Sequence, residues 1–463
     1  MAAIQVRRNG TLAFIYWIWD SLDRTIFTAI KFSFPARFVS PFGFLGMLTF
    51  ITFIHLGISG ALLMFYYEPI ITRSWDSVQF INDTVPFGFH IRNVHYHGSN
   101  AMVLLAILHM YYQFFSGRYR IRNEVLWVTG ILLGSITVLE AFTGYNLIMN
   151  ERAVLAINIG ASLNNAAPIV GPLAKQLLFG AGLTEVVLRM YSFHVFIVPI
   201  VMVILMFFHF PRTLVWDIPM SAAICGSILL VGGLYPVELG LPFDPNIPPG
   251  ITVPEWYLTA LYAFLRTGAE KFTVGLVLPT IFILAGMFII FIDNSKRFTW
   301  RERPLLTAIG VTTIVQGYLT SFWGFYVNPD SSIDLFTRLF IQPLPFYTAM
   351  LISVVVSFAS VYGVINYLKK RDAARIASRS PRPKSMPMTT LKSNWLFITM
   401  AALIVFQIFL TALSIHAYSN GLNSLSLFEL GLVMITFSVM THLYRYGKNI
   451  ISADLVKATP VSK

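Results

Sequence analysis

Cysteine and charge are the two things this 463-residue sequence has little of. Cys225 is the only cysteine, and a single thiol excludes disulfides, iron–sulfur ligation and CxxCH-type attachment of a cofactor within the chain. Charged residues make up only 12% of the sequence, whereas 56% of residues are hydrophobic and the mean hydropathy is +0.68. This composition excludes an ordinary water-soluble domain and indicates a chain that lies in a lipid bilayer.

Long apolar segments are what the sequence has instead. A helix needs about 20 apolar residues to cross a hydrocarbon layer about 30 Å thick. Ten segments fit this requirement: 43–67, 97–115, 126–149, 190–210, 220–236, 273–292, 304–323, 346–367, 395–417 and 425–444. We therefore expect an all-α membrane protein with about ten transmembrane helices. The apolar stretch 12–19, which no small-residue cleavage site follows, predicts an amphipathic surface helix rather than a signal peptide.

The net charge of +12 follows the expected topology. Most lysines and arginines lie at the N-terminus, at the C-terminus and in the connections 118–122, 296–303 and 369–394, which the ten spans place on one side. The positive-inside rule makes that side cytoplasmic, and both termini with it. The basic charge thus indicates topology and not a nucleic-acid partner. Segment 369–394 also contains prolines and is predicted to be a basic cytoplasmic linker near anionic lipid.

Four histidines on two of the spans have matched spacing. His95 and His109 are 14 residues apart, and His194 and His209 are 15 apart, so each pair lies near one face of its helix and spans about 21–22 Å. Antiparallel packing brings His95 to His194 (the outer pair) and His109 to His209 (the inner pair). A lone membrane histidine is more often a packing residue, and a transporter can use histidines as a proton relay. Two stacked bis-imidazole sites favour two haems in an electron-conducting bundle.

Glycines on the first and third spans repeat the spacing of the histidines. Gly46 and Gly60 have the same separation along the chain as His95 and His109, and so do Gly130 and Gly144. A porphyrin between helices requires close backbone approach, so we expect each glycine to face one haem. Ordinary packing of small residues between helices is the alternative.

A second motif lies between the spans, where Pro254-Glu255-Trp256-Tyr257 follows the proline-rich stretch 241–250. Irregular backbone at a membrane boundary is tolerated where it is buried in protein or lines a cavity. A carboxylate there can accept a proton from a bound hydroxyl. Taken alone, an interfacial glutamate is more often a solvated loop residue.

These motifs together resemble the cytochrome b family of cytochrome bc complexes, of which PEWY is a signature. Similarity to cytochrome b6 lies in YYEP…FGFHIRNVHYHGS (66–99), WVTG…FTGY (127–145), APIVG (167–171) and RMYSFHVFIVP (189–199). From about 220 to 325, with FLRT at 264–267, the chain resembles subunit IV of those complexes. We accordingly expect a surface helix with a four-helix di-haem bundle (1–218), a subunit IV-like part (219–368), the linker (369–394) and two additional transmembrane helices with a tail (395–463).

The resemblance implies roles for individual residues. His95, His109, His194 and His209 are the implied axial ligands of two non-covalent haems, b-type or modified. His97 competes with His95, but it points about 120° away from His109. Arg92 and Arg189 are implied to pair with propionates of the outer haem. Glu255 is implied to accept a proton in a quinol-oxidation pocket, with Tyr257 nearby. Tyr145 is implied to form the facing wall of that pocket.

The function implied by the resemblance is quinol oxidation by a respiratory or photosynthetic bc-type complex. One electron goes to a Rieske iron–sulfur protein and the other through the two haems to an inner quinone, with a contribution to proton translocation. The expected partners are the Rieske protein, a downstream cytochrome, copper protein or terminal oxidase, a second copy of the chain and membrane lipid. The expected location is the plasma membrane of a prokaryote. A di-haem anchor that shuttles electrons between quinone and a dehydrogenase or oxidase without bifurcation is the alternative.

Three departures from the family pattern affect these expectations. Where the family commonly has Pro-Trp after the glycine and tyrosine of the third span, this chain reads GYNLIMNE (144–151), so the outer pocket differs in shape. Glu151 lies beside Arg152, and we expect a surface ion pair rather than a supplement to proton release. Tyr112 replaces the usual basic residue after His109, so the propionate partner of the inner haem is not predicted. Phe44 replaces the cysteine that tethers an extra haem in plastidic relatives, so we expect no third haem.

Overall fold

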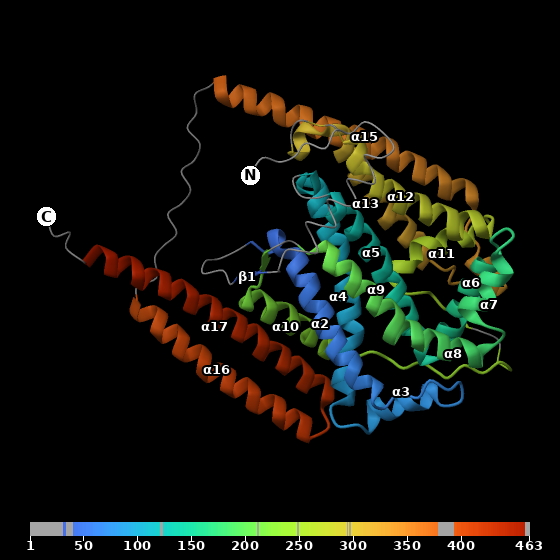
Figure 1. The fold of residues 1–463 in the computed structure, drawn as a ribbon, viewed down its shortest axis with the longest axis horizontal. Helices are drawn as coiled ribbons and strands as arrows, with labels where there is room; N and C mark the ends of the chain where they lie inside the picture. The colour runs from blue at the N-terminus through green and yellow to red at the C-terminus, as the bar shows by residue number, and fades with distance from the viewer. Residues whose placement is uncertain are drawn as a thin grey trace.

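The computed structural model describes residues 31–33, 40–120, 124–210, 213–247, 250–293, 295, 298–377 and 393–458. These residues are almost entirely helical (Figure 1), which confirms the predicted all-α class. One short strand pair interrupts the pattern, since β1 (Lys31–Ser33) pairs in parallel with β2 (Thr213–Val215). The predicted surface helix over 12–19 lies outside the described residues.

Four helical segments form the N-terminal bundle. They are α2 (Leu45–Met64), which continues η1 (Pro41–Phe44), α4 (Gly88–Phe115), α5 (Glu124–Tyr145), and the continuous run of α8 (Leu183–Ser192), η4 (Phe193–Ile197) and α9 (Val198–His209). Helix α2 packs on α4, and α5 packs on α9. The segment η4 is a π-helical turn that precedes Pro199, where the missing backbone N–H interrupts the regular ladder. This turn is the part of the helix that carries His194.

Short amphipathic helices cover one end of the bundle. They are α3 (Ser74–Asp83), α6 (Glu151–Asn165) and α7 (Gly171–Phe179), and the turn η3 (Asn146–Ile148) follows α5 at this end. The turn η2 (Arg118–Arg120) follows α4 at the other end, beside the inner pair of histidines. Asn150 caps α6 by accepting a hydrogen bond from the backbone N–H of Ala153 at 2.9 Å. Apolar residues of α6, α7 and α8 form a buried cluster that includes Val154, Phe179 and Val187. This cluster fixes the start of α6 beside the end of α5.

The second half of the chain packs on the bundle. It contains α10 (Ile218–Leu234), η5 (Trp256–Leu258), α11 (Thr259–Arg266), η6 (Thr273–Val277), α12 (Leu278–Ile292), η7 (Trp300–Glu302), α13 (Pro304–Phe325), α14 (Leu335–Leu339) and α15 (Pro343–Ala377). Helix α10 contacts α4, and α12 contacts α5. Helix α13 lies between α11 and α15. The turn η5 begins within the PEWY motif, and the Nε1 of Trp256 donates to the Oδ1 of Asn100 on α4 at 2.6 Å. The motif therefore lies next to the bundle.

The two C-terminal helices form a hairpin at one edge of the molecule (Figure 1). Helices α16 (Ser393–Ser419) and α17 (Asn423–Ala458) pack against each other, and α17 also lies along α10. Glycines make the second contact close, because a Cβ on Gly226 of α10 would lie 2.9 Å from the Cβ of Met434. The predicted additional helices are therefore packed mainly on α10.

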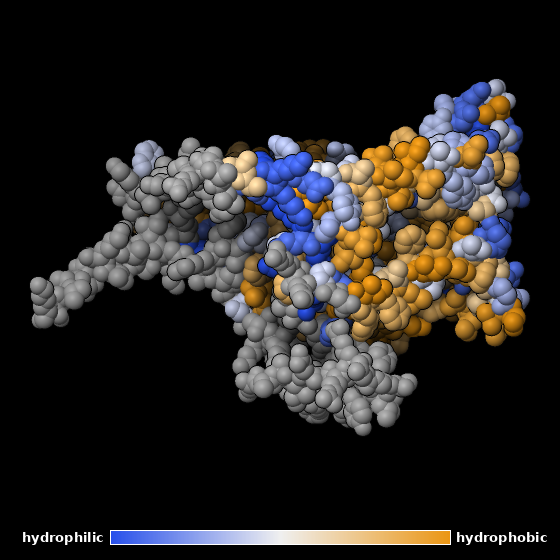
Figure 2. All heavy atoms as spheres, turned by 90° about the horizontal axis from the view of Figure 1, so that it is seen from above, coloured by the Kyte–Doolittle hydropathy of each residue, from blue (hydrophilic) through white to orange (hydrophobic). Residues whose placement is uncertain are grey.

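Membrane-spanning character is clear for most of the predicted spans. Within the described part of the chain, eight segments are long and apolar enough to cross a bilayer: 41–64, 124–148, 183–209, 273–292, 304–325, 335–374, 395–419 and 423–445. Helix α10 is shorter, at 17 residues, and the 28-residue α4 begins with the polar residues His90, Arg92 and Asn93. Large apolar side chains are exposed along these segments, and apolar surface covers much of the face in Figure 2. The chain is a multi-pass membrane protein, and the cytoplasmic position of its termini stays a prediction.

The predicted linker begins later than its composition indicated. Helix α15 continues to Ala377, so residues 369–377 are helical rather than part of a flexible connection. Lysine, arginine and alanine are strong helix formers, and the helix can therefore extend beyond the bilayer into water. Asp372 in this extension lies 3.1 Å from the Nη1 of Arg301. The remainder of the predicted linker, up to 392, lies outside the described residues.

Candidate functional site

The four predicted histidines form two facing pairs. In the outer pair, the ring centroids of His95 on α4 and His194 on η4 are 6.1 Å apart and the rings are nearly perpendicular, at 87°. In the inner pair, the centroids of His109 and His209 are 6.2 Å apart at 89°. A metal held by two imidazole nitrogens at about 2.0–2.1 Å each, with each ring centre about 1.1 Å behind its nitrogen, needs a separation of about 6 Å. Each pair is therefore spaced to hold one metal atom between its rings.

Polar contacts at Nδ1 orient three of these rings. The Nδ1 of His209 lies 2.8 Å from the carbonyl oxygen of Leu126, and the Nδ1 of His194 lies 3.1 Å from that of Glu140. The Nδ1 of His95 lies 3.0 Å from the Oγ of Ser59. When Nδ1 is held in this way, Nε2 is the nitrogen available to a metal.

The four predicted glycines lie directly against the imidazole rings. A Cβ on Gly144 would lie 2.5 Å from the Cε1 of His194, and one on Gly130 would lie 2.8 Å from the Cε1 of His209. Gly60 and Gly46 have the same relation to the other two histidines, at 3.1 and 2.9 Å. We expected each glycine to face a haem. In the structure each glycine instead makes room for the imidazole ring of one of the four histidines.

A cavity surrounds each pair. The outer cavity is about 420 Å³ and includes Gly60, Gly144 and both histidines of the outer pair in its wall. The inner cavity is about 230 Å³ and has Gly46, Gly130 and the inner histidines in its wall. Apolar side chains such as Phe53, Met102 and Met202 line both cavities. The donor set and these apolar walls fit a flat macrocycle with a central metal, held by two imidazoles.

The two predicted propionate arginines have different surroundings. Arg92 lies in the wall of the outer cavity, where its Nη1 donates to the Oδ1 of Asn82 at 2.9 Å and to the carbonyl of Val237 at 2.8 Å. Arg189 does not reach the cavity. Its guanidinium is 3.0 Å from Glu185, one helical turn earlier, and also donates to the carbonyl of Gln176. These local partners hold Arg189 at the surface, so only Arg92 lies where the prediction requires.

A third cavity, of about 320 Å³, adjoins the outer cavity. Its wall includes Tyr96, His97, Tyr145, Ile148, Asn150, Arg152, Tyr235, Val237 and Glu255. The Glu255 side chain is buried, with the residue only 5% exposed. The Nη1 of Arg152 lies 2.9 Å from its Oε1, and the Tyr96 hydroxyl lies 3.2 Å from both carboxylate oxygens. Glu255 is thus a buried, doubly held carboxylate and not a solvated loop residue.

The predicted surface ion pair between Glu151 and Arg152 is wrong. Arg152 turns inward to Glu255, while Glu151 accepts a hydrogen bond from the backbone N–H of Gly250. Successive residues on a helix point about 100° apart, so these neighbours at the start of α6 meet different segments.

Two tyrosines complete this region. Tyr145 lines both the outer cavity and the third cavity, and its buried hydroxyl has no hydrogen-bond partner among the described residues. Tyr257 also lines the outer cavity. Burial, followed by the nearby Glu255 charge, raises the pKa of Tyr257, so its hydroxyl stays protonated at neutral pH. The structure therefore brings all three predicted pocket residues to one place.

The family matches cover the bundle and the PEWY region. Residues 29–214 match the family described as cytochrome b/b6/petB, and residues 242–340 match cytochrome b(C-terminal)/b6/petD. The chain is 34% identical over 212 residues to cytochrome b6 of Prochlorothrix hollandica, covering 44% of this chain and 93% of that protein. It belongs to the cytochrome b/b6 family. Cytochrome b6 of Mesostigma viride is also 34% identical, over 194 residues that cover 41% of this chain and 90% of that protein.

A solved structure has the same fold as this family member. A chain of a hyperthermophilic respiratory complex III aligns with a TM-score of 0.55 over 77% of this chain and 99% of that chain, at 20% identity. Family membership makes the protein a cytochrome b subunit of a bc-type oxidoreductase complex with other subunits, and the family binds haem b. Membership of this family also excludes a transporter that uses its histidines as a proton relay. Both family matches end before α15, so α16 and α17 lie beyond them.

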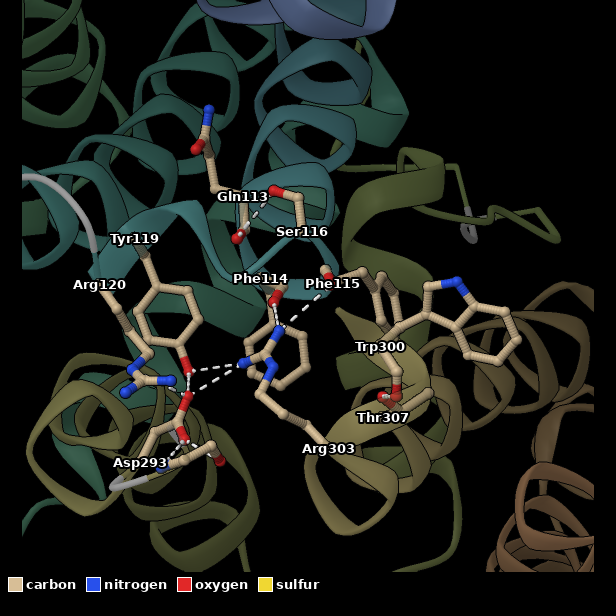
Figure 3. Close-up of polar contacts among 11 residues, drawn as sticks. Gln113, Phe114, Phe115, Ser116, Tyr119, Arg120, Asp293, Trp300, Arg303 and Thr307 are labelled. Carbon is tan, nitrogen blue, oxygen red and sulfur yellow. Dashed lines mark hydrogen bonds and ion pairs between the residues drawn. The ribbon is translucent and has the colours of Figure 1, made fainter. Parts of the chain in front are cut away.

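The inner end of this cytochrome b contains a buried polar cluster that no sequence pattern predicted (Figure 3). Tyr119, in the wall of the inner cavity, donates to the Oδ2 of Asp293 at 2.5 Å, and the Nη1 of Arg303 lies 3.0 Å from the same oxygen. Arg303 also donates to the carbonyl of Phe114 at 2.7 Å. Burial raises the pKa of Asp293, but hydrogen bonds from Ser295 and Tyr119 outweigh it, so that pKa is below its usual value.

Three further site residues were not predicted: Tyr96, Glu140 and Arg152. Tyr96 follows a predicted ligand directly, and Arg152 stood among the departures from the family. Glu140 follows Leu126 at the same spacing as Gly144 follows Gly130. Comparing the two halves of the third span at this spacing is the signal that would have singled it out.

Proposed function

We propose that this chain is the di-haem, quinol-oxidising subunit of its complex, with His95 and His194 binding the outer haem and His109 and His209 the inner haem. The observation that carries the proposal is the separation of the imidazole rings, 6.1 and 6.2 Å, inside two separate cavities. Haem, when bound, supplies reversible one-electron transfer. The ligands on α4 are about 21 Å apart along the helix, which gives a route across much of the bilayer.

The third cavity is the proposed quinol pocket. Its Glu255 carboxylate is the proton acceptor for a quinol hydroxyl. Arg152 and Tyr96 hold the carboxylate at the edge of the cavity, 2.9 and 3.2 Å away. The Tyr145 hydroxyl, buried and without a hydrogen-bond partner among the described residues, is a donor or acceptor for the second oxygen of the ring.

Arg152 has a second part in this pocket. Glu255 can take a proton only if its ion pair with Arg152 loosens, since protonation removes the charge that the guanidinium pairs with. The Nε of Arg152 is buried and has no hydrogen-bond partner in the described part of the chain. A quinol oxygen supplies the acceptor that this donor needs. Binding of quinol therefore satisfies Arg152 while Glu255 receives the proton.

The complete reaction removes two electrons and two protons from one quinol. One electron would go to a Rieske iron–sulfur protein, and the other to a quinone at the inner end, with a contribution to proton translocation. Haems held by His95 with His194 and by His109 with His209 would supply the one-electron transfer between the two ends. A cytochrome, a copper protein or a terminal oxidase accepts electrons from the Rieske protein. The assembly contains a second copy of the chain and lies in a prokaryotic plasma membrane.

The test is a reductive titration of the purified complex, followed through the haem α-band. We expect two haems per chain, and substitution of His194 or His209 by Leu removes a different one in each variant. A complex without haem, or variants that lose the same haem, would overturn the proposal. The anchor without bifurcation makes the same spectral prediction, and the Glu255 substitution described below separates the two.

A further inference from the structure

The hairpin of α16 and α17, which lies beyond both family matches, is anchored at the inner end of α10. The Nη1 of Arg445 on α17 lies 2.6 Å from the Oδ2 of Asp217, the residue that caps α10. Ser438 of α17 donates to the carbonyl of Pro219, in the first turn of α10, at 2.6 Å. Because α17 is one continuous helix, these contacts also fix the position of its outer end.

At that outer end the hairpin holds the start of α4. The ring of Phe87 stacks on the ring of Tyr418 from α16, with centroids 4.3 Å apart and planes inclined by 4°. The backbone N–H of Phe87 donates to the Tyr418 hydroxyl at 3.2 Å. The Nε2 of His90 lies 3.2 Å from the Oγ of Ser426 on α17, and Ser414 of α16 donates to the carbonyl of Ser426 at 2.9 Å. Both helices of the hairpin therefore take part in this contact.

The backbone of α4 requires support at this point. Phe87 precedes the first residue of α4 with φ 59° and ψ 7°, a left-handed conformation that bulky residues rarely adopt and that persists only where surrounding contacts enforce it. A backbone N–H at the start of a helix also has no acceptor within the helix. Tyr418 supplies both the acceptor and a flat surface for the Phe87 ring. The hairpin thus stabilises the conformation from which α4 begins.

The residues that follow this turn reach the outer cavity. Arg92 and His95 lie two and five residues after His90, and both are in the cavity wall. Between them, Val94 packs in a buried cluster with the completely buried Leu427 of α17. A helix is stiff over so short a distance, so a displacement of the first turn of α4 also displaces Arg92 and His95.

We infer that the hairpin is a positioning element of the outer site, with Tyr418 and Ser426 as its positioning residues. This inference rests on the proposed function, because it requires a haem between His95 and His194. Tyr418 and Ser426 are both outside the wall of the outer cavity, so they act through the start of α4. When their contact is lost, Arg92 withdraws from the cavity. Removal of a positive charge from the surroundings of a haem favours its oxidised form.

The test uses the complete complex with Tyr418→Leu, which removes the ring and the hydroxyl, and with Tyr418→Phe, which removes the hydroxyl alone. Hydrogen–deuterium exchange of peptides covering residues 85–97 measures the hold on α4 independently of haem. We expect exchange about fivefold faster in Tyr418→Leu, as for the loss of one net hydrogen bond, and a smaller effect in Tyr418→Phe and in Ser426→Ala.

Potentiometric titration of the α-band and low-spin EPR measure the effect on the outer site. In Tyr418→Leu we expect a lower midpoint potential and a shifted EPR signal for the outer haem, with the inner haem unchanged. Ser419→Ala is the matched control for the hydroxyl, because Ser419 is next to Tyr418 and its Oγ bonds its own helix at the carbonyl of Ile415. Tyr444→Leu is the control for the ring, since this tyrosine of α17 is exposed.

The other outcomes count against the inference. Unchanged exchange in Tyr418→Leu would show that the hairpin does not hold α4. Faster exchange with an unchanged outer haem would show that the contact does not reach the site, and the proposed function would stand. Loss of both haems even from Tyr418→Phe would show that the hairpin serves assembly and not positioning. A wild-type complex without haem would instead refute the proposed function, on which the inference depends.

Discussion

Glu255 meets the requirements of a proton acceptor through its immediate contacts. A buried carboxylate is tolerated when it is paired and hydrogen-bonded, and Arg152 and Tyr96 supply both conditions. The Arg152 side chain is itself 35% exposed, so solvent screens the pair and its contribution to stability is closer to that of a surface pair, about 1 kcal/mol. The pair can therefore loosen during turnover at modest cost.

Replacing Glu255 by Gln keeps the shape of the side chain and removes its ability to take a proton. We expect quinol oxidation to fall about 10²–10⁴-fold, the usual contribution of a general base, while both haems remain. Steady-state quinol oxidation with an artificial electron acceptor measures the rate, and the reduced spectrum checks the haems. An unchanged rate would refute the quinol pocket and favour the di-haem anchor.

Replacing Arg152 by Gln removes the charged donor that faces the third cavity. A hydrogen bond to a charged group contributes about 1.5–3 kcal/mol, so we expect the KM for quinol to rise roughly tenfold or more, with a smaller effect on kcat. Arg152→Lys retains the charge without the forked geometry and serves as the matched control, with an intermediate KM. Equal kinetics for all three proteins would show that Arg152 does not touch the substrate.

The pairing of site residues could be predicted from the sequence where the residues recur at a regular helical spacing. The matched spacing was enough to pair the four histidines, because both histidines of each helix lie near one face. The partner of Arg152 was not predictable in this way. It depends on how α6 packs beside η5, which lies much later in the chain, and no local pattern encodes that contact.

At the scale of helices, the close contact of α5 with the histidine-bearing helix depends on two glycines. The Cβ of an alanine at Gly144 would overlap the His194 ring, at 2.5 Å from its Cε1. Helix–helix distances are set by such small residues. The substitution must displace the imidazole or separate the helices, and either change moves the ring from its metal position.

We therefore expect Gly144→Ala to lose the outer haem or weaken its binding severely, and to retain the inner haem. The α-band of the purified variant, compared with wild type at equal protein concentration, measures the loss. Gly317→Ala is the control, since a Cβ on this α13 glycine would meet no described atom within 4 Å beyond the backbone of its own helix. Retention of both haems in Gly144→Ala would show that the two helices separate without disturbing the site.

The sequence predicted where the long helices lie better than it predicted the residues at which they end. Long apolar runs marked the eight described segments that are long and apolar enough to cross a bilayer, because burial in lipid leaves few other solutions. The short helices α3, α6 and α7 were not predicted, since none of them contains a long apolar run. The end of α15 was misplaced because basic residues suit both a linker and an exposed helix.

At the scale of the whole molecule, the cluster around Asp293 joins the two family-matched halves at the inner end. Tyr119 comes from the first half and Arg303 from the second, and Arg303 also holds the last turn of α4 through the carbonyl of Phe114 (Figure 3). The Asp293 and Arg303 side chains are almost fully buried. Breaking such a pair by removing one partner costs about 3–5 kcal/mol, because the other charge stays buried.

The lowered pKa of Asp293 makes this joint depend on pH. A carboxyl group with a depressed folded-state pKa stabilises the fold above its unfolded pKa of about 3.9, and the contribution is lost as pH falls through the folded pKa. We expect the thermal stability of the detergent-purified protein to fall below about pH 4, and Asp293→Asn to be less stable at neutral pH with a weaker acid dependence. Glu68→Gln is the control, because this carboxylate forms an exposed pair with Arg73. An Asp293→Asn protein as stable as wild type at neutral pH would show that the two halves are held together by their apolar contacts alone, with Arg303 sufficiently paired by the backbone carbonyls of α4.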